Sequence, residues 1–156
     1  KRLMESSLEV VQKLSECVGR DIYHNGRLNR GLLSSRVFGE SDKIVLLNSI
    51  VHPVVRFDFY RWSESLNEEI CFVESAILYE SRFDELVDEV WTVTAPEELR
   101  ISRVRQRSGL TEEEIKKRMA AQLSEEEKQR RAAHIIWNDG NVSVIHRVLS
   151  LLKSLE

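Results

Sequence analysis

Residues 89–140 read EVWTVTAPEELRISRVRQRSGLTEEEIKKRMAAQLSEEEKQRRAAHIIWNDG, two short apolar segments separated by a charged region. The segments EVWTVTAP and AHIIWND are rich in β-branched and aromatic residues, which is typical of buried strands. A third apolar run, ICFVESAIL, lies upstream over residues 70–78 and is expected to form another strand. Because helical stretches alternate with these strands, the sequence predicts an α/β fold whose parallel sheet is covered by helices.

The charged region between the two segments contains separate signals for several short helices. Gly109 is expected to end the first helix. Thr111 with Glu114 forms a predicted capping box, and Ser124 with Glu127 forms a second. Two starts so close together predict a helical hairpin with a hinge rather than one long helix.

The first of these helices carries a row of arginines. Arg100, Arg103 and Arg107 are spaced i, i+3 and i+7, so they share one stripe, whereas Arg105 points elsewhere. Such a stripe attracts polyanions, and a mobile arginine-bearing hairpin is how phosphoryl-transfer enzymes close over a nucleotide. The alternative is a solvated surface whose arginines pair with the neighbouring glutamates.

The first third of the chain predicts helices and a turn. Ser6 is expected to cap a helix that Gly19 ends, and Asn25-Gly26 is expected to form a turn. The inward face of this helix would carry Leu8, Val11, Leu14 and Val18. Asn29 can cap a second helix that runs through Phe38.

A proline signals a break in the next helical stretch. Ser41 can cap a helix, but the residue before a proline is pushed out of the α region. That helix should therefore end near His52, and another should begin at Pro53. The aromatic side chains of this and later apolar runs are expected in the core: Phe57, Phe59, Trp62, Trp91 and Trp137. A final amphipathic helix would face inward through Val144, Val148 and Leu151.

Composition limits the classes of function. With 156 residues and 42% hydrophobic content, residues 1–156 are expected to form a single domain. The net charge of -3 offers no general footprint for nucleic acid. Cys17 and Cys71 are too few for a disulfide framework, and no apolar run is long enough for a membrane span. A cytoplasmic setting is the expectation.

Six stretches in register resemble the dephospho-CoA kinase family. They are GRLNRGLLSSRVF, IVHPVV with Arg56, ESAILYES leading to LVDEVWTV, RISRVRQRSGL, RMAAQLSEEEK and AHIIWNDG. The resemblance implies ATP-dependent phosphorylation of the ribose 3′-hydroxyl of dephospho-CoA, the last step of CoA biosynthesis. It also implies a P-loop kinase-like parallel sheet flanked by helices, with a helical substrate-binding region over residues 26–66 and a helical lid over residues 103–131.

Two departures from the family pattern accompany this resemblance. The family's Asp-x-Pro-Leu-Leu-Phe-Glu stretch has variants here at Glu74, Ala76, Ile77 and Tyr79, while Glu80 is retained. A P-loop of the form Gly-x-x-x-x-Gly-Lys-Ser/Thr is absent, so its lysine and the general-base aspartate are expected upstream of Lys1. The 156 residues alone are therefore expected to be inactive.

The resemblance also implies roles for individual residues. Arg103 and Arg107 would approach the phosphates of ATP, and Asn138 would lie near the adenine or only shape a turn. His52, Arg56 and Glu80 would bind dephospho-CoA, with His52 placed at the N-terminus of a helix that begins at Pro53. Glu80 could instead pair with Arg82 or another base. Three further residues could touch a ligand or only brace the hairpin: Arg118, Gln122 and Lys128.

Partners and alternative functions complete the expectations. ATP and Mg²⁺ are the implied cofactors, dephospho-CoA is the implied partner, and the chain would be a monomer or a weak homo-oligomer. One alternative function is that of another P-loop small-molecule or nucleotide kinase. A second is that of a non-catalytic truncated fragment that binds a ligand or partner.

Overall fold

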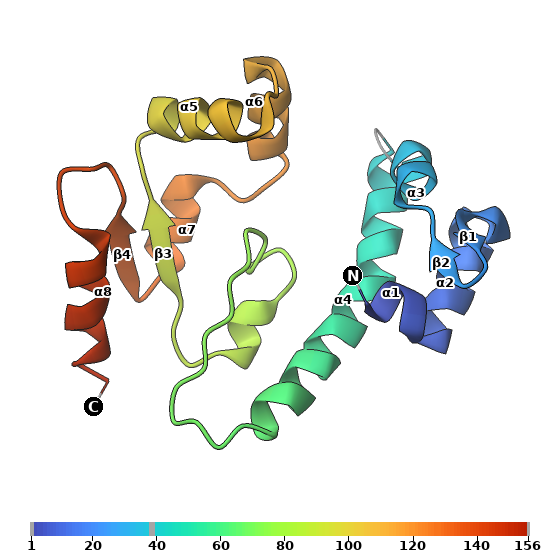
Figure 1. Cartoon of the computed structure of the whole chain (residues 1–156), viewed down its shortest axis with the longest axis horizontal. Coiled ribbons are helices and arrows are strands. Elements are labelled where there is room, and N and C mark those ends of the chain that lie inside the picture. The colour runs from blue at the N-terminus through green and yellow to red at the C-terminus, as the bar shows by residue number, and fades with distance from the viewer. Residues whose placement is uncertain (1, 38–39, 156) are drawn as a thin grey trace. The chain divides into compact units, whose positions relative to one another are not determined.

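The computed structural model describes residues 2–37 and 40–155. These form two compact units, Lys1–Val73 and Glu74–Glu156. Each unit has its own elements and its own buried residues, and each is described by itself (Figure 1).

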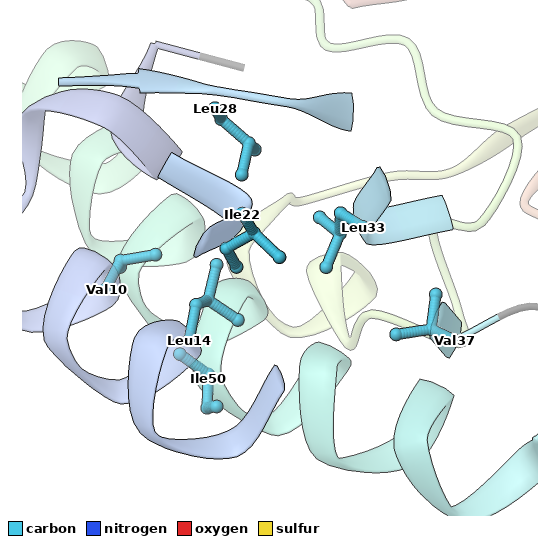
Figure 2. Packing of buried hydrophobic residues seen from close by; sticks show 7 residues of the cluster. All are labelled: Val10, Leu14, Ile22, Leu28, Leu33, Val37 and Ile50. Carbon is cyan, nitrogen blue, oxygen red and sulfur yellow. The ribbon is translucent and has the colours of Figure 1, made fainter. Parts of the chain in front are cut away.

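The first unit is mainly helical. Its elements are α1 (Leu3–Ser6), α2 (Leu8–Val18), a short 3-10 turn η1 (Arg20–Ile22), β1 (Tyr23–His24), β2 (Arg27–Leu28), α3 (Arg30–Val37) and α4 (Ser41–Glu64). Aliphatic side chains from most of these elements meet in one core, shown in Figure 2. Its buried members are Val10, Leu14, Ile22, Leu28, Leu33, Val37 and Ile50. This core joins helices that are far apart in the chain, so it defines the unit.

The start of α2 differs from the prediction by one residue. Ser7, not Ser6, caps the helix, because its hydroxyl accepts a hydrogen bond from the Val10 backbone N–H while Ser6 ends α1. Leu8 is 87% exposed, whereas Val10 and Leu14 are 1% and 0% exposed. The inward face predicted through Leu8 is therefore wrong at that position, since Val10 takes its place in the core. Gly19 ends the helix as predicted.

The predicted turn and the next cap are confirmed. Asn25 and Gly26 both have positive φ, 49° and 75°, and connect β1 to β2 in an antiparallel hairpin. Such a turn favours Asn-Gly because both central residues must adopt left-handed backbone conformations. The Asn29 side chain accepts from the Leu32 backbone N–H at 3.0 Å and so caps α3. The predicted end of this helix at Phe38 lies outside the described residues.

The predicted break at Pro53 is wrong. α4 is one helix of 24 residues with Pro53 inside it, and Ser41 is its first residue rather than its cap. A proline in a helix interior removes one backbone hydrogen bond. Packing compensates on both sides of it, because Ile50, Val51 and Val54 all contribute to the same core. The local preference of a residue before proline is therefore overridden by burial.

The second unit contains the parallel strands. Its elements are a 3-10 turn η2 (Phe83–Leu86), β3 (Trp91–Thr94), α5 (Glu97–Ser108), α6 (Glu112–Ala120), α7 (Glu125–Arg131), β4 (His134–Trp137) and α8 (Val144–Leu152). β3 pairs with β4 in parallel, with Trp91 opposite His134 and Thr94 opposite Trp137. α7 contacts β3 and α8 contacts β4, as Figure 1 shows. The predicted α/β class, with a parallel sheet flanked by helices, is confirmed.

The strand predicted over residues 70–78 is not formed. This stretch is irregular and continues into a turn, and neither β3 nor β4 pairs with it. An apolar run becomes a strand only when a neighbouring strand completes its hydrogen-bond ladder, and the described residues provide none here. Ile70 and Phe72 are accordingly exposed.

Several aromatic residues are also outside the core. Phe57, Trp62 and Trp137 are 62%, 47% and 49% exposed, so their predicted burial is wrong. Trp91 and Phe59 are half-buried. Leu151 at the inner face of α8 is buried, as predicted. Of the described helices, none combines the length and apolar composition that a bilayer crossing requires.

Candidate functional site

The carboxyl ends of β3 and β4 bring predicted nucleotide-binding residues together. The Arg103 guanidinium, on α5, donates from Nη1 to the backbone carbonyl of Asn138 at 2.6 Å. Asn138 directly follows β4, and its own N–H donates to the carbonyl of Thr94 at the end of β3. Ligands of open α/β sheets bind outside the carboxyl ends of the strands. The structure thus places a cation and a polar turn at the edge where such ligands bind.

The turn after β4 is itself fixed by Asp139. Its carboxylate accepts from the backbone N–H of Asn141 at 2.9 Å and from the Asn141 side chain at 3.0 Å. These hydrogen bonds, chiefly the backbone one, hold the pKa of Asp139 below its usual value, and the Arg103 charge adds to the effect. Asn138 therefore lies in a structured turn.

A partly buried polar cluster lies at the end of β3. Glu125, in the first turn of α7, accepts from the Thr94 hydroxyl at 2.9 Å and pairs with Arg100 at 3.1 Å. Lys128 lies 3.7 Å from the same carboxylate. Arg100 also donates to the carbonyl of Ala95 at 3.0 Å. One carboxylate thus connects a strand end with two helices.

The helical insertion has the predicted start signals, with one difference. The Thr111 capping box is complete, because its hydroxyl accepts from Glu114 N–H while the Glu114 carboxylate accepts from Thr111 N–H at 2.8 Å. The hydrogen bonds that the Glu114 carboxylate accepts from the Thr111 backbone N–H and hydroxyl lower the pKa of Glu114. Ser124 caps α7, but Glu127 pairs with Arg130 at 2.6 Å instead of returning to the cap. Gly109 ends α5 with φ of 67°, as predicted.

Glu80 has a different partner from either of those considered. Its carboxylate accepts from the backbone N–H of Leu123 at 2.6 Å, while Arg82 pairs with Glu85. Leu123 immediately precedes the Ser124 cap of α7. Glu80 therefore binds the peptide backbone where the helical insertion returns toward β4.

Tyr79 and Asp84, which are close to Glu80 in the sequence, both contact Arg131 at the end of α7. The Arg131 guanidinium lies 4.5 Å from the centre of the Tyr79 ring and 3.8 Å from the Asp84 carboxylate. Burial raises the pKa of Tyr79, whose buried hydroxyl has no hydrogen-bond partner among the described residues. The segment before η2 is thus attached to both ends of α7.

The remaining candidates of the insertion differ in their surroundings. Arg107 and Arg118 are exposed. The Gln122 side chain accepts from Lys128 at 3.2 Å, so these two brace the hairpin in this structure. The three arginines of the stripe have different surroundings: Arg100 pairs with Glu125, Arg103 donates to a carbonyl, and Arg107 is exposed in the last turn of α5.

His52 and Arg56 are in the first unit, on the same face of α4 one turn apart. Both are half-buried. Burial lowers the pKa of His52, so its neutral form is favoured. Because α4 continues through Pro53, the helix N-terminus expected beside His52 does not exist. Any role in binding must rest on the side chains themselves.

Sequence reasoning missed Thr94 and Glu125. Thr94 is the last residue of a strand that was predicted, a position at which α/β folds place ligand-facing groups. Glu125 was one of three consecutive glutamates, and nothing in the sequence distinguished it from the exposed Glu126. Among the described residues, no group of three or more His, Cys, Asp or Glu side chains could hold a metal ion.

The second unit defines a class of protein: an α/β domain with an arginine-bearing helical insertion at the carboxyl ends of its parallel strands. The sequence model of dephospho-CoA kinase matches residues 1–143. The chain belongs to the dephospho-CoA kinase family, whose members phosphorylate dephospho-CoA with ATP.

Individual relatives agree. The chain is 36% identical to dephospho-CoA kinase of Bacteroides fragilis over 99% of this chain and 76% of the relative. It is 33% identical to dephospho-CoA kinase of Porphyromonas gingivalis, over 99% of this chain and 77% of that one.

Solved structures are also similar. A crystal structure of a Thermus thermophilus protein matches with a TM-score of 0.78 and 31% identity, over 92% of this chain and 74% of that one. Dephospho-CoA kinase of Campylobacter jejuni matches with a TM-score of 0.66 and 25% identity, over 99% of this chain and 81% of that one.

Proposed function

We propose that this protein transfers the γ-phosphoryl group of ATP to the ribose 3′-hydroxyl of dephospho-CoA. Family membership supports the reaction. In the structure, the proposal is supported by the 2.6 Å hydrogen bond between Arg103 and the Asn138 carbonyl. It puts a guanidinium, a group that suits phosphate, beside the turn that carries Asn138.

The proposed roles are those that the resemblance to the family implies. Arg103 and Arg107 contact the ATP phosphates, and Asn138 lies near the adenine. His52 and Arg56 bind dephospho-CoA from α4, and Glu80 orients the substrate side of the site through the backbone that it holds at Leu123. Guanidinium groups aimed at a transferring phosphoryl group neutralise charge that develops in the transition state.

Magnesium is proposed to arrive with ATP as its complex. The described residues include no group of three or more His, Cys, Asp or Glu side chains that could hold a metal ion. We also propose a cytoplasmic protein that is a monomer or a weak homo-oligomer, with a substrate-binding region over residues 26–66 and a lid within residues 103–131. Cys17 and Cys71 are both free and exposed, which suits a reducing compartment.

A pair of Arg103 variants tests the nucleotide role in the full-length protein. Arg103→Ala is expected to lower kcat/KM for ATP by about 100-fold, because an arginine on a transferring phosphoryl group contributes large rate factors. Arg103→Lys should recover only part of this loss, since an ammonium lacks the planar fork. Arg130→Ala, at an exposed arginine of α7, is the control. Parental kinetics in Arg103→Ala would refute the role.

The acceptor is tested by product analysis. With ATP supplied, phosphorylation of dephospho-CoA is expected to exceed that of nucleoside monophosphates and of shikimate. A preference for either competitor would instead assign the protein to another small-molecule kinase. Absence of turnover with all three, in a folded full-length protein, would favour a binding role.

A further inference from the structure

α7, the helix that returns from the insertion to β4, is held by polar contacts at both ends. At its start, Glu125 joins Thr94 and Arg100, whose side chains belong to the strand end and to α5. The side chains of Arg100 and Glu125 are only 27% and 21% exposed. Partly buried ion pairs are screened less by solvent than exposed ones. α7 is therefore connected to the sheet from its first turn.

The segment before η2 adds further contacts at the start and the end of α7. Glu80 accepts from Leu123 N–H at 2.6 Å, and Arg131 lies over the Tyr79 ring. A hydrogen bond from a backbone N–H to a carboxylate is charge-assisted and stronger than a neutral one. Because Leu123 directly precedes the cap of α7 and Arg131 is its last residue, these contacts fix the orientation of the helix as well as its position.

α6 is attached in a different way. It contacts α5, and its buried side chain is Ile115, at 2% exposure. The ion pair between Lys116 and Glu112 lies within the helix itself. Gly109, with φ of 67°, precedes α6, and the Glu80-bound residue Leu123 follows it. This segment thus begins at the glycine that ends α5 and finishes at a backbone amide held by a carboxylate.

We propose that Glu80 and Glu125 are positioning residues that hold α7 as the fixed base of the lid, so that only residues 109–121 move when nucleotide binds. This proposal deepens the kinase function given above and rests on it. It divides the lid expected over residues 103–131 into a moving helix, α6, and two fixed ones. Neither glutamate needs to touch a reacting atom, since each acts through the helix it holds.

Hydrogen exchange of the unmodified full-length protein gives the first test. Local structure favours α6, which is longer than α7 and has the complete capping box. The proposal nevertheless requires slower amide exchange in residues 125–131 than in residues 112–120, because tertiary contacts protect α7. Faster exchange in α7 than in α6 would overturn the proposal, whether or not the protein phosphorylates dephospho-CoA.

Glu80 variants give the second test. Removing a charge-assisted hydrogen bond should raise the exchange rate of Leu123 N–H in Glu80→Ala by about tenfold. The amide oxygen in Glu80→Gln can still accept from this N–H and should restore most of the protection. Glu113→Ala, which removes an exposed carboxylate of α6, is the control. Equal Leu123 exchange in Glu80→Ala and the parent would contradict the proposal.

Kinetics separate positioning from stability. A loosened base lowers the population of the closed state, which weakens apparent nucleotide binding in proportion. Glu80→Ala is therefore expected to raise KM for ATP by about fivefold while kcat changes less than about twofold. Glu80→Gln should have nearly the parental KM. If Glu80→Ala still turns over and its KM for ATP is unchanged, the positioning role is overturned. If the protein shows the expected exchange pattern but no turnover, only the kinase function is overturned.

Discussion

The carboxylate of Glu125 shows how the surroundings of one residue decide the value of its charge. Glu125 interacts with Arg100 and Lys128, and the Lys128 side chain is only 15% exposed. Arg130, by comparison, is 72% exposed in its pair with Glu127. Exposed pairs contribute little because water screens them and ordering two long side chains costs entropy. Glu125 and Glu127 lie two positions apart on α7, yet the charge of Glu125 has a structural role and that of Glu127 only a minor one.

His52 gives a pH prediction at this scale. Burial lowers its pKa from the usual 6.5, so the unfolded chain binds a proton more readily than the folded one. The unfolding free energy should therefore be highest above pH 6.5 and fall as the pH drops through the lowered pKa. His52→Gln should flatten this part of the profile, measured by chemical denaturation at several pH values.

The control for this profile is His24→Gln, at an exposed histidine of the same unit. Subtracting the two profiles isolates the half-buried site. If His52→Gln keeps the full parental slope below pH 6.5, the imidazole of His52 is not the group responsible.

At the scale of elements, α4 shows that packing can exceed a local signal. Pro53→Ala is expected to stabilise the first unit by about 1–3 kcal/mol, because alanine restores a backbone hydrogen bond and is the better helix former. Thermal unfolding measured by circular dichroism checks this. Val45→Ala, at a 67% exposed position of α4, is the control for propensity alone. A lower melting temperature in Pro53→Ala would show that the proline fits the helix without cost.

Elements with local signals were predictable, whereas those that need distant partners were not. Asn29, Thr111 and Gly109 act through backbone groups within a few residues, so their sequences sufficed. The run at residues 70–78 has the composition of a strand, but hydrogen bonding to another strand decides that state. The same reason explains why two of the apolar segments became strands: β3 and β4 pair with each other.

Both units of the molecule contain buried side chains, and its stability should reflect this. Leu14→Ala is expected to lower the unfolding free energy of the first unit by about 2–5 kcal/mol, because the side chain is fully buried in the core. Leu8→Ala on the same helix should change it by less than about 0.5 kcal/mol, because Leu8 is 87% exposed. Urea titration followed by circular dichroism makes the comparison. Equal effects of the two variants would contradict the assigned inner face of α2.

The sequence predicted several residues of the candidate site, but not which of their atoms contact one another. The stripe spacing drew attention to Arg103, and the family resemblance implied the roles of Arg103 and Asn138, yet their direct hydrogen bond could not be read from residues 35 positions apart. The contact of Glu80 with Leu123 spans 43 positions and uses a backbone atom, which no side-chain pattern reveals. Roles that depend on tertiary proximity were therefore beyond the sequence.

Because α4 is one continuous helix, a tilt at its packed part would also displace its other end. Core packing holds it near Ile50, and the exposed Trp62 lies about 18 Å further along at a rise of about 1.5 Å per residue. A tilt of about 5° around the anchored part would displace the Trp62 end by about 1.6 Å, from the same rise. A tilt of the helix about its packed part would therefore move its exposed end, and the fluorescence of the Trp62 indole would report that movement.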